Sequence, residues 1–88
     1  MRLDKYLKVS RLIKRRTVAK EVCDAGRISI NGNAAKAGSQ VKAGDKLLIS
    51  FGSRRMEVEV LSTPETVRAD EAKLLYNIIS DNKASSLD

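Results

Sequence analysis

The stretch that decides the fold is KRRTVAKEVCDAGRISING, residues 14–32. Its first half places four apolar residues at the i+3 and i+4 spacing of one helical face: Val18, Ala19, Val22 and Cys23. Gly26 follows where a glycine with positive φ closes a helix. The pattern predicts a helix over about 14–25. It also predicts that Cys23 is a small buried hydrophobe rather than a reactive thiol, because the chain has no His to activate it.

The second half of this stretch changes to a period of two. The residues at 28–30 alternate between apolar and polar, and the pair Asn31-Gly32 favours a type I′ turn, in which both central residues need positive φ. A hairpin of 28–30 with 33–36 is therefore expected. Two more strands are predicted at 46–51 and 56–60, the second with Met56, Val58 and Val60 facing inward.

A first short helix is expected over 3–9, where three apolar residues share one helical face: Leu3, Tyr6 and Leu7. Asp4 lies in its first turn, where a carboxylate complements the helix dipole. Lys5 and Lys8 fall on the solvent side of this helix. A break is expected near Ser10.

The C-terminal third predicts one more helix, over 68–81. Its apolar residues recur at helical spacing: Ala72, Leu75, Tyr76 and Ile79. We therefore expect residues 1–61 to form the main domain, 62–81 a helix that packs on it, and 82–88 a disordered tail.

Composition excludes several classes of function. The chain has 88 residues, no His and one Cys, so it predicts one small domain without an imidazole base, an internal disulfide or a thiolate zinc site. No Gly-x-Gly-x-x-Gly or Walker phosphate loop occurs, and we expect no enzyme activity, no cofactor and no metal. No apolar run approaches the ~20 residues of a membrane span, and the N-terminus lacks the apolar region of a signal peptide. With the single unpaired cysteine, these features predict a cytoplasmic protein without membrane association.

Positive charge is concentrated in the first third of the chain. Residues 1–27 hold nine Lys or Arg against three Asp or Glu, which equals the whole net charge of +6. The block KRR at 14–16 lies between Arg11 and Lys20, and like charges this close repel unless a polyanion such as phosphate backbone offsets them. Aromatic residues make up only 3% of the chain, too few for the stacking platforms of single-strand binders, so we expect recognition of a structured RNA. A second basic pair, RR at 54–55, fits a solvated turn and a phosphate contact equally well.

An ordered set of residues within 2–50 resembles the alpha-L RNA-binding motif, the domain named after small-subunit ribosomal protein four. The residues that carry the resemblance are Arg2-Leu3-Asp4-Lys5-Tyr6-Leu7, Ser10-Arg11, Arg15-Arg16-Thr17, Ala19, Gly26-Arg27-Ile28, Ile30-Asn31-Gly32, Lys36, Val41 and Gly44-Asp45. The resemblance implies an α+β fold in which two short N-terminal helices pack on a small antiparallel sheet and present a basic face to RNA. The predicted C-terminal helix is added to this fold.

Within this family the chain is similar to the short, stand-alone members of bacterial ribosome-associated quality control, in its length, in residues 1–22 and in 72–76. That similarity implies a monomer that binds stalled, split large ribosomal subunits and supports alanine tailing of the nascent chain. The implied partners are large-subunit ribosomal RNA, the P-site tRNA and the protein RqcH. Three residues match the RNA-facing positions of the family: Arg2, Arg16 and Thr17. Charge adds six further candidates: Lys5, Arg11, Lys14, Arg15, Lys20 and Lys36.

Three other functions stay open from the sequence. Heat-shock members of the family also bind free large subunits, although they usually carry a longer basic C-terminal extension. Two short helices, the second of them basic, also suit a small DNA-binding regulator of the helix-turn-helix type. An acidic helix over 65–81 suits a protein adaptor. Sequencing the nucleic acid captured in a pull-down separates these functions.

Overall fold

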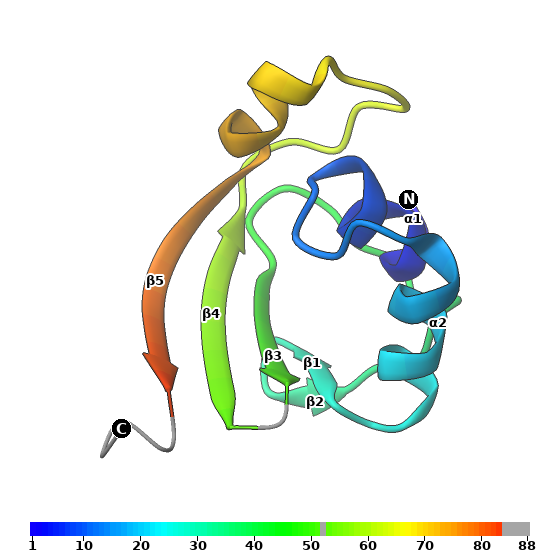
Figure 1. Cartoon of the computed structure of the whole chain (residues 1–88), viewed down its shortest axis with the longest axis vertical. Coiled ribbons are helices and arrows are strands. Elements are labelled where there is room, and N and C mark those ends of the chain that lie inside the picture. Colours follow the sequence, from blue (N-terminus) through cyan, green and yellow to red (C-terminus); the bar gives the residue numbers. More distant parts are fainter. Residues whose placement is uncertain (52, 84–88) are drawn as a thin grey trace.

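The computed structural model describes residues 1–51 and 53–83, in which two helices pack against one sheet (Figure 1). The first elements are α1 (Leu3–Val9), α2 (Arg16–Asp24), β1 (Ile28–Ile30), β2 (Asn33–Ala34), β3 (Lys46–Phe51) and β4 (Arg54–Val60). A 3-10 helix, η1 (Ala69–Leu75), leads into the last strand, β5 (Tyr76–Lys83). The sheet is antiparallel, with strand order β2-β1-β3-β4-β5. The predicted α+β fold, with two N-terminal helices on an antiparallel sheet, is confirmed.

The helix-to-hairpin stretch folds as its sequence predicts. Gly26 has a φ of 77° and donates its N–H to the carbonyl of Cys23 at 3.0 Å, which closes α2. Asn31 and Gly32 have φ values of 51° and 86°, both in the left-handed region that a type I′ turn requires. β2 ends at Ala34, earlier than predicted; the N–H of the buried Ala35 still donates to the carbonyl of Ile28 at 2.9 Å, and the chain then turns away from the sheet.

The core lies between one face of the sheet and the inner sides of α1 and α2. Its largest fully buried side chains include Tyr6, Leu3, Leu7, Ile28, Leu47, Ile49, Val58 and Val60. Met56 is buried with Val58 and Val60, as the alternation in β4 predicts. Cys23 is also buried, but Val18, predicted to be buried, is 38% exposed. The buried residues of α2 are Ala19 and Cys23, which form a stripe one side chain wide that does not include Val18.

The predicted helix over 68–81 is wrong beyond Leu75. η1 keeps the helical spacing, with Ala72 and Leu75 buried, but residues 76–83 extend as β5 along β4. The paired register runs from Val60 with Tyr76 to Arg54 with Lys83, and it is shifted by a bulge at Glu57/Val58.

The physical reason for this difference is pairing with a neighbouring strand, which the spacing of apolar residues in the sequence cannot reveal. β4 offers an edge whose N–H and C=O groups pair with 76–83, and the β-branched Ile78 and Ile79 favour an extended backbone. Ile79, predicted on a buried helical face, is therefore exposed. Of the tail predicted from 82 onward, residues 82 and 83 belong to β5, and residues 84–88 lie outside the described residues.

Tyr6 connects α1 to the C-terminal segment. Its buried hydroxyl donates a 2.7 Å hydrogen bond to the carbonyl oxygen of Leu75. Burial raises the pKa of Tyr6 above its ordinary value, so the hydroxyl stays protonated and remains a donor. This contact holds the end of η1 against α1 and thereby fixes one end of the segment that approaches the basic surface described next.

Candidate nucleic-acid interface

Two open hollows on the helical side of the molecule share the side chain of Arg16. The first is lined by Lys5, Lys8, Val9, Arg11 and Arg16, together with Glu65, Thr66 and Val67. The second is lined by Arg2, Asp4, Arg16, Thr17 and Lys20. The cations that border the two hollows are thus Arg2, Lys5, Lys8, Arg11, Arg16 and Lys20. Such a gathering of Lys and Arg over two neighbouring helices is the electrostatic footprint of a phosphate-binding surface.

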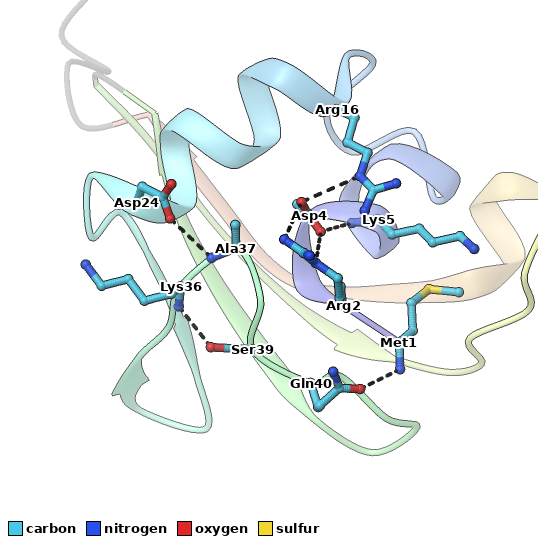
Figure 2. A network of polar contacts seen from close by, with 10 residues as sticks. All are labelled: Met1, Arg2, Asp4, Lys5, Arg16, Asp24, Lys36, Ala37, Ser39 and Gln40. Carbon is cyan, nitrogen blue, oxygen red and sulfur yellow. Dashed lines mark hydrogen bonds and ion pairs between the residues drawn. The ribbon is translucent and has the colours of Figure 1, made fainter.

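A buried carboxylate lies beneath this surface. The side chain of Asp4 is only 3% exposed, and its Oδ1 accepts a 2.8 Å hydrogen bond from the backbone N–H of Lys5 (Figure 2). Arg2 donates from Nε to Oδ1 at 3.2 Å and from Nη2 to Oδ2 at 3.3 Å. Arg16 approaches from α2, with its Nε 3.5 Å from Oδ2. Because a buried carboxylate is costly unless it is paired and hydrogen-bonded, these contacts account for the position of Asp4.

This role of Asp4 is not apparent in the sequence. Its place in the first turn of α1 predicts a contribution to the helix dipole, and the structure confirms that position. Its burial and its ion pair with Arg16 come from the packing of α1 against α2, whereas its other partner, Arg2, lies only two residues away. An ion pair across twelve residues has no signature in local spacing.

The start of α1 is braced by the segment 37–41. The N–H of Leu3 donates to the carbonyl of Ser39 at 2.8 Å, and the N–H of Asp4 donates to the carbonyl of Ala37 at 3.2 Å. Arg2 forms an antiparallel bridge with Gln40. These backbone contacts satisfy N–H groups that a helix leaves unpaired at its first turn. They also fix the backbone from which Arg2 and Asp4 project.

The start of α2 carries positive charge without compensation from its own residues. Its N-cap, Arg15, makes no capping hydrogen bond through its side chain, and the first turn contains no acidic residue. The positive end of the helix dipole therefore lies beside Arg15 and Arg16, an unfavourable arrangement that a bound anion relieves.

Arg11 closes α1 in a strained conformation. Its φ is 64°, in the left-handed region, which costs a residue with a Cβ about 1–2 kcal/mol. The N–H of Arg11 donates to the carbonyl of Lys8 at 3.1 Å, and the turn brings the Arg11 side chain to the first hollow.

One acidic side chain reaches the rim of the first hollow. The carboxylate of Glu65, from the segment between β4 and η1, accepts a hydrogen bond from the ammonium of Lys5. This bond lowers the pKa of Glu65. Glu65 therefore neutralises one of the bordering cations, at a position where a bound phosphate would compete with it.

The structure gathers most of the predicted site residues, but not all of them. Around the two hollows lie Arg2, Lys5, Arg11, Arg16, Thr17 and Lys20. Lys14 and Arg15 are exposed on the segment between α1 and α2 and do not line either hollow. Lys36 lies elsewhere, on the loop after β2, and Figure 2 shows its side chain directed away from Arg2 and Arg16.

Two charged residues at the first hollow, Lys8 and Glu65, are not among the predicted site residues. Lys8 lies three residues after Lys5 on the same helical face, so the i+3 spacing contained the signal. Glu65 had no such signal, because its position depends on how the segment 61–75 folds back over α1.

The basic pair at 54–55 lies on a different part of the molecule. The guanidinium of Arg54 donates to the carboxylate of Asp81 on β5, from Nε at 2.8 Å and from Nη2 at 2.5 Å. Arg54 is thus engaged by a neighbouring strand, and Arg55 beside it is exposed.

The surface offers ionic and hydrogen-bonding chemistry. Within residues 1–51 and 53–83, no three His, Cys, Asp or Glu side chains gather where they could hold a metal ion. Burial, followed by the nearby carboxylates Asp4 and Asp24, raises the pKa of the Cys23 thiol to about 11, so it is protonated at neutral pH. In the same part of the chain, no helix has the length and apolar character needed to span a bilayer.

Comparison with known proteins places this surface in context. Residues 1–47 match the S4 domain, and that match contains all the cations that border the hollows. A protein of Halalkalibacterium halodurans named RQC P-site tRNA stabilizing factor is 59% identical over 85 residues, which are 97% of each chain. A Bacillus subtilis protein of the same name is 58% identical over 83 residues, 94% of this chain and 96% of that one. Among solved structures, the trimeric Heat Shock Protein 15 of Vibrio cholerae matches with a TM-score of 0.83 at 28% identity, over 91% of this chain and 82% of that one.

Proposed function

The chain belongs to the S4 domain family, and on that premise we propose that it is an RNA-binding factor of ribosome-associated quality control that stabilises P-site tRNA. It binds large ribosomal subunits left after a stalled ribosome has split, and it contacts large-subunit ribosomal RNA and the P-site peptidyl-tRNA together. It holds the tRNA while RqcH brings alanyl-tRNA for C-terminal alanine tailing. The names of the two bacterial relatives support the tRNA and the quality-control process.

The observation that carries this proposal is the position of Arg16 between two cation-bordered hollows. One hollow opens over α1 and the other lies between the start of α1 and α2, so two phosphate backbones can be contacted from one compact surface. The RNA-facing residues are proposed to be Arg2, Lys5, Arg11, Lys14, Arg15, Arg16, Thr17, Lys20 and Lys36, with Lys8 added from the structure. Residues 1–61 form the RNA-binding domain.

The mechanism is binding and positioning. Phosphate contacts by Lys and Arg fix the register and orientation of an RNA without reading its sequence, which suits a factor that must accept any stalled peptidyl-tRNA. We propose that the protein acts as a monomer in the cytoplasm, without enzyme activity.

Co-sedimentation with purified large subunits tests the proposal. Subunits that carry peptidyl-tRNA in the P site are compared with empty subunits and with free duplex DNA of matched phosphate content. We expect the protein to pellet with both kinds of subunit and more strongly with the tRNA-bearing one. Equal binding to tRNA-bearing and empty subunits would contradict a P-site role, and preference for DNA would instead support the helix-turn-helix alternative.

A heat-shock-type role in large-subunit recycling is the second candidate, favoured by the match to Heat Shock Protein 15. A reconstituted tailing reaction with RqcH, alanyl-tRNA and tRNA-bearing subunits separates the two. In our proposal, added protein lengthens the alanine tails; in a recycling role it leaves the tails unchanged and clears the subunit of peptidyl-tRNA. The protein-adaptor alternative is less well supported, because only Ala69–Leu75 of the predicted acidic helix over 65–81 is helical and residues 76–81 form a strand.

A further inference from the structure

We propose that Asp4 is a positioning residue of the RNA-binding surface. Its buried carboxylate holds the guanidiniums of Arg2 and Arg16 as one preset pair, with their remaining N–H groups directed to the phosphates of the bound RNA. The proposal deepens the proposed function and rests on it, because it takes RNA phosphate as the ligand of the pair.

The geometry leaves one edge of each guanidinium available. Arg2 uses Nε and Nη2 for the two oxygens of Asp4, and Arg16 uses Nε alone. A guanidinium carries five N–H donors, so each arginine retains donors along its Nη1–Nη2 edge. Both side chains are 50% exposed although the Asp4 side chain is 3% exposed, so the carboxylate lies beneath and the guanidiniums lie at the surface (Figure 2).

The pair is assembled from two different helices, which makes it dependent on Asp4. Arg2 immediately precedes α1, and Arg16 is the first residue of α2. Two guanidiniums repel each other, and a carboxylate between them converts that repulsion into two attractive contacts. Fixing the arginines before RNA arrives also removes the loss of side-chain freedom that binding otherwise requires.

Because Asp4 is negatively charged, removing its charge distinguishes a positioning role from general electrostatic attraction of RNA. Asp4 carries the only negative charge among the residues that line the second hollow within the described chain. If the surface attracted RNA only through its net positive charge, removing the negative charge of Asp4 would strengthen binding. If Asp4 positions the arginines, removing its charge weakens binding to the specific RNA and leaves non-specific polyanion binding equal or stronger.

The variant Asp4→Asn tests this distinction. Asparagine keeps an oxygen that can accept the backbone N–H of Lys5, but it loses the charge that holds the guanidiniums. Asp24→Asn is a matched control with the same change in charge. Asp24 is exposed at the end of α2, and its Oδ1 accepts the backbone N–H of Ala37 at 3.4 Å. Each variant is titrated against tRNA-bearing large subunits and against heparin over a range of salt concentrations.

We expect Asp4→Asn to weaken binding to tRNA-bearing subunits by about tenfold, the order of loss for one well-placed arginine contact. The slope of log affinity against log salt should become shallower by about 1–2, because one or two phosphate contacts are lost. Binding to heparin should stay equal or become tighter. Asp24→Asn should leave both affinities equal or slightly tighter.

Two results would overturn the positioning role. One is that Asp4→Asn binds the subunits as tightly as Asp24→Asn does. The other is that Asp4→Asn, shown by melting to be folded, weakens heparin and subunit binding equally without a change in salt slope. Failure of the unaltered chain to prefer tRNA-bearing subunits would instead count against the proposed function.

A measurement on the unaltered protein covers the case in which Asp4→Asn does not fold. In proton–nitrogen NMR spectra, the Nε–Hε signals of Arg2 and Arg16 should exchange with water more slowly than that of the exposed Arg15. Equal exchange rates for the three arginines would show that Asp4 does not hold the pair, and the proposal would be wrong.

Discussion

Replacing Arg16 should show whether this residue makes a specific phosphate contact or only adds to the positive charge of the surface. Arg16 is half exposed, and its Nε makes one ion pair with Asp4 at 3.5 Å. Arg2 still donates to both oxygens of the buried Asp4 carboxylate when Arg16 is removed, so Arg16→Ala should change the melting temperature little. Loss of its contacts in both hollows should weaken association with tRNA-bearing subunits by about 1–3 kcal/mol, or about 5- to 150-fold. For five or six neutralised phosphates, the salt slope of the unaltered protein should be roughly −4 to −5, and Arg16→Ala should make it shallower by about 0.9.

Arg16→Lys and Lys20→Ala complete the comparison, measured by sedimentation at several salt concentrations. Arg16→Lys keeps the charge but loses the planar fork, so we expect weaker binding with an unchanged salt slope. Lys20→Ala removes a charge that borders the second hollow but not the first, so it should reduce the slope as Arg16→Ala does but cost less affinity. If Arg16→Lys binds like the unaltered protein and Arg16→Ala is no weaker than Lys20→Ala, Arg16 is an interchangeable cation and the reasoning fails.

Three further predictions concern the turn, the thiol and the rim of the first hollow. Gly32→Val should lower the free energy of unfolding by about 1–3 kcal/mol, because the φ of Gly32 is 86°, although a Cβ there would meet no atom of the described residues within 4 Å apart from its chain neighbours. Gly38→Ala, where an added Cβ also meets open space, is the control and should melt like the unaltered protein. If Gly32→Val, Gly38→Ala and the unaltered protein all melt at the same temperature, the type I′ turn is contradicted. The pKa of Cys23, about 11, lies above that of an unfolded thiol, so native protein should alkylate far more slowly than unfolded protein at pH 8. The contribution of Cys23 to the free energy of unfolding is fully present below the pKa of the unfolded thiol and is lost as the pH rises through the folded pKa. Urea unfolding at pH 8 and at a pH near 11 should show this loss. Glu65→Gln should free Lys5 and steepen the salt slope of subunit binding by about 0.9, and an unchanged slope would mean that Lys5 does not contact RNA.

Features set by local chemistry were predictable from the residues alone. The helix over 16–24, its closing glycine and the Asn31-Gly32 turn follow from spacing and from the backbone conformations those residue types permit. The concentration of positive charge in residues 1–27 likewise indicated where the basic surface lies. These signals lie within a few residues of one another, which is the range over which periodicity and turn chemistry operate.

Tertiary structure alone decided the C-terminal segment and the internal order of the basic surface. Residues 76–81 have helical spacing, yet they form a strand because β4 offers an unpaired edge, and that edge exists only once the sheet has folded. Asp4 is buried between Arg2 and Arg16 because α1 packs on α2, and Glu65 reaches Lys5 because the segment between β4 and η1 returns to α1. Composition therefore determined that this protein carries a positive face. Contacts between residues distant in the chain determined which of its cations are held in place, which is neutralised and which remain exposed at the surface.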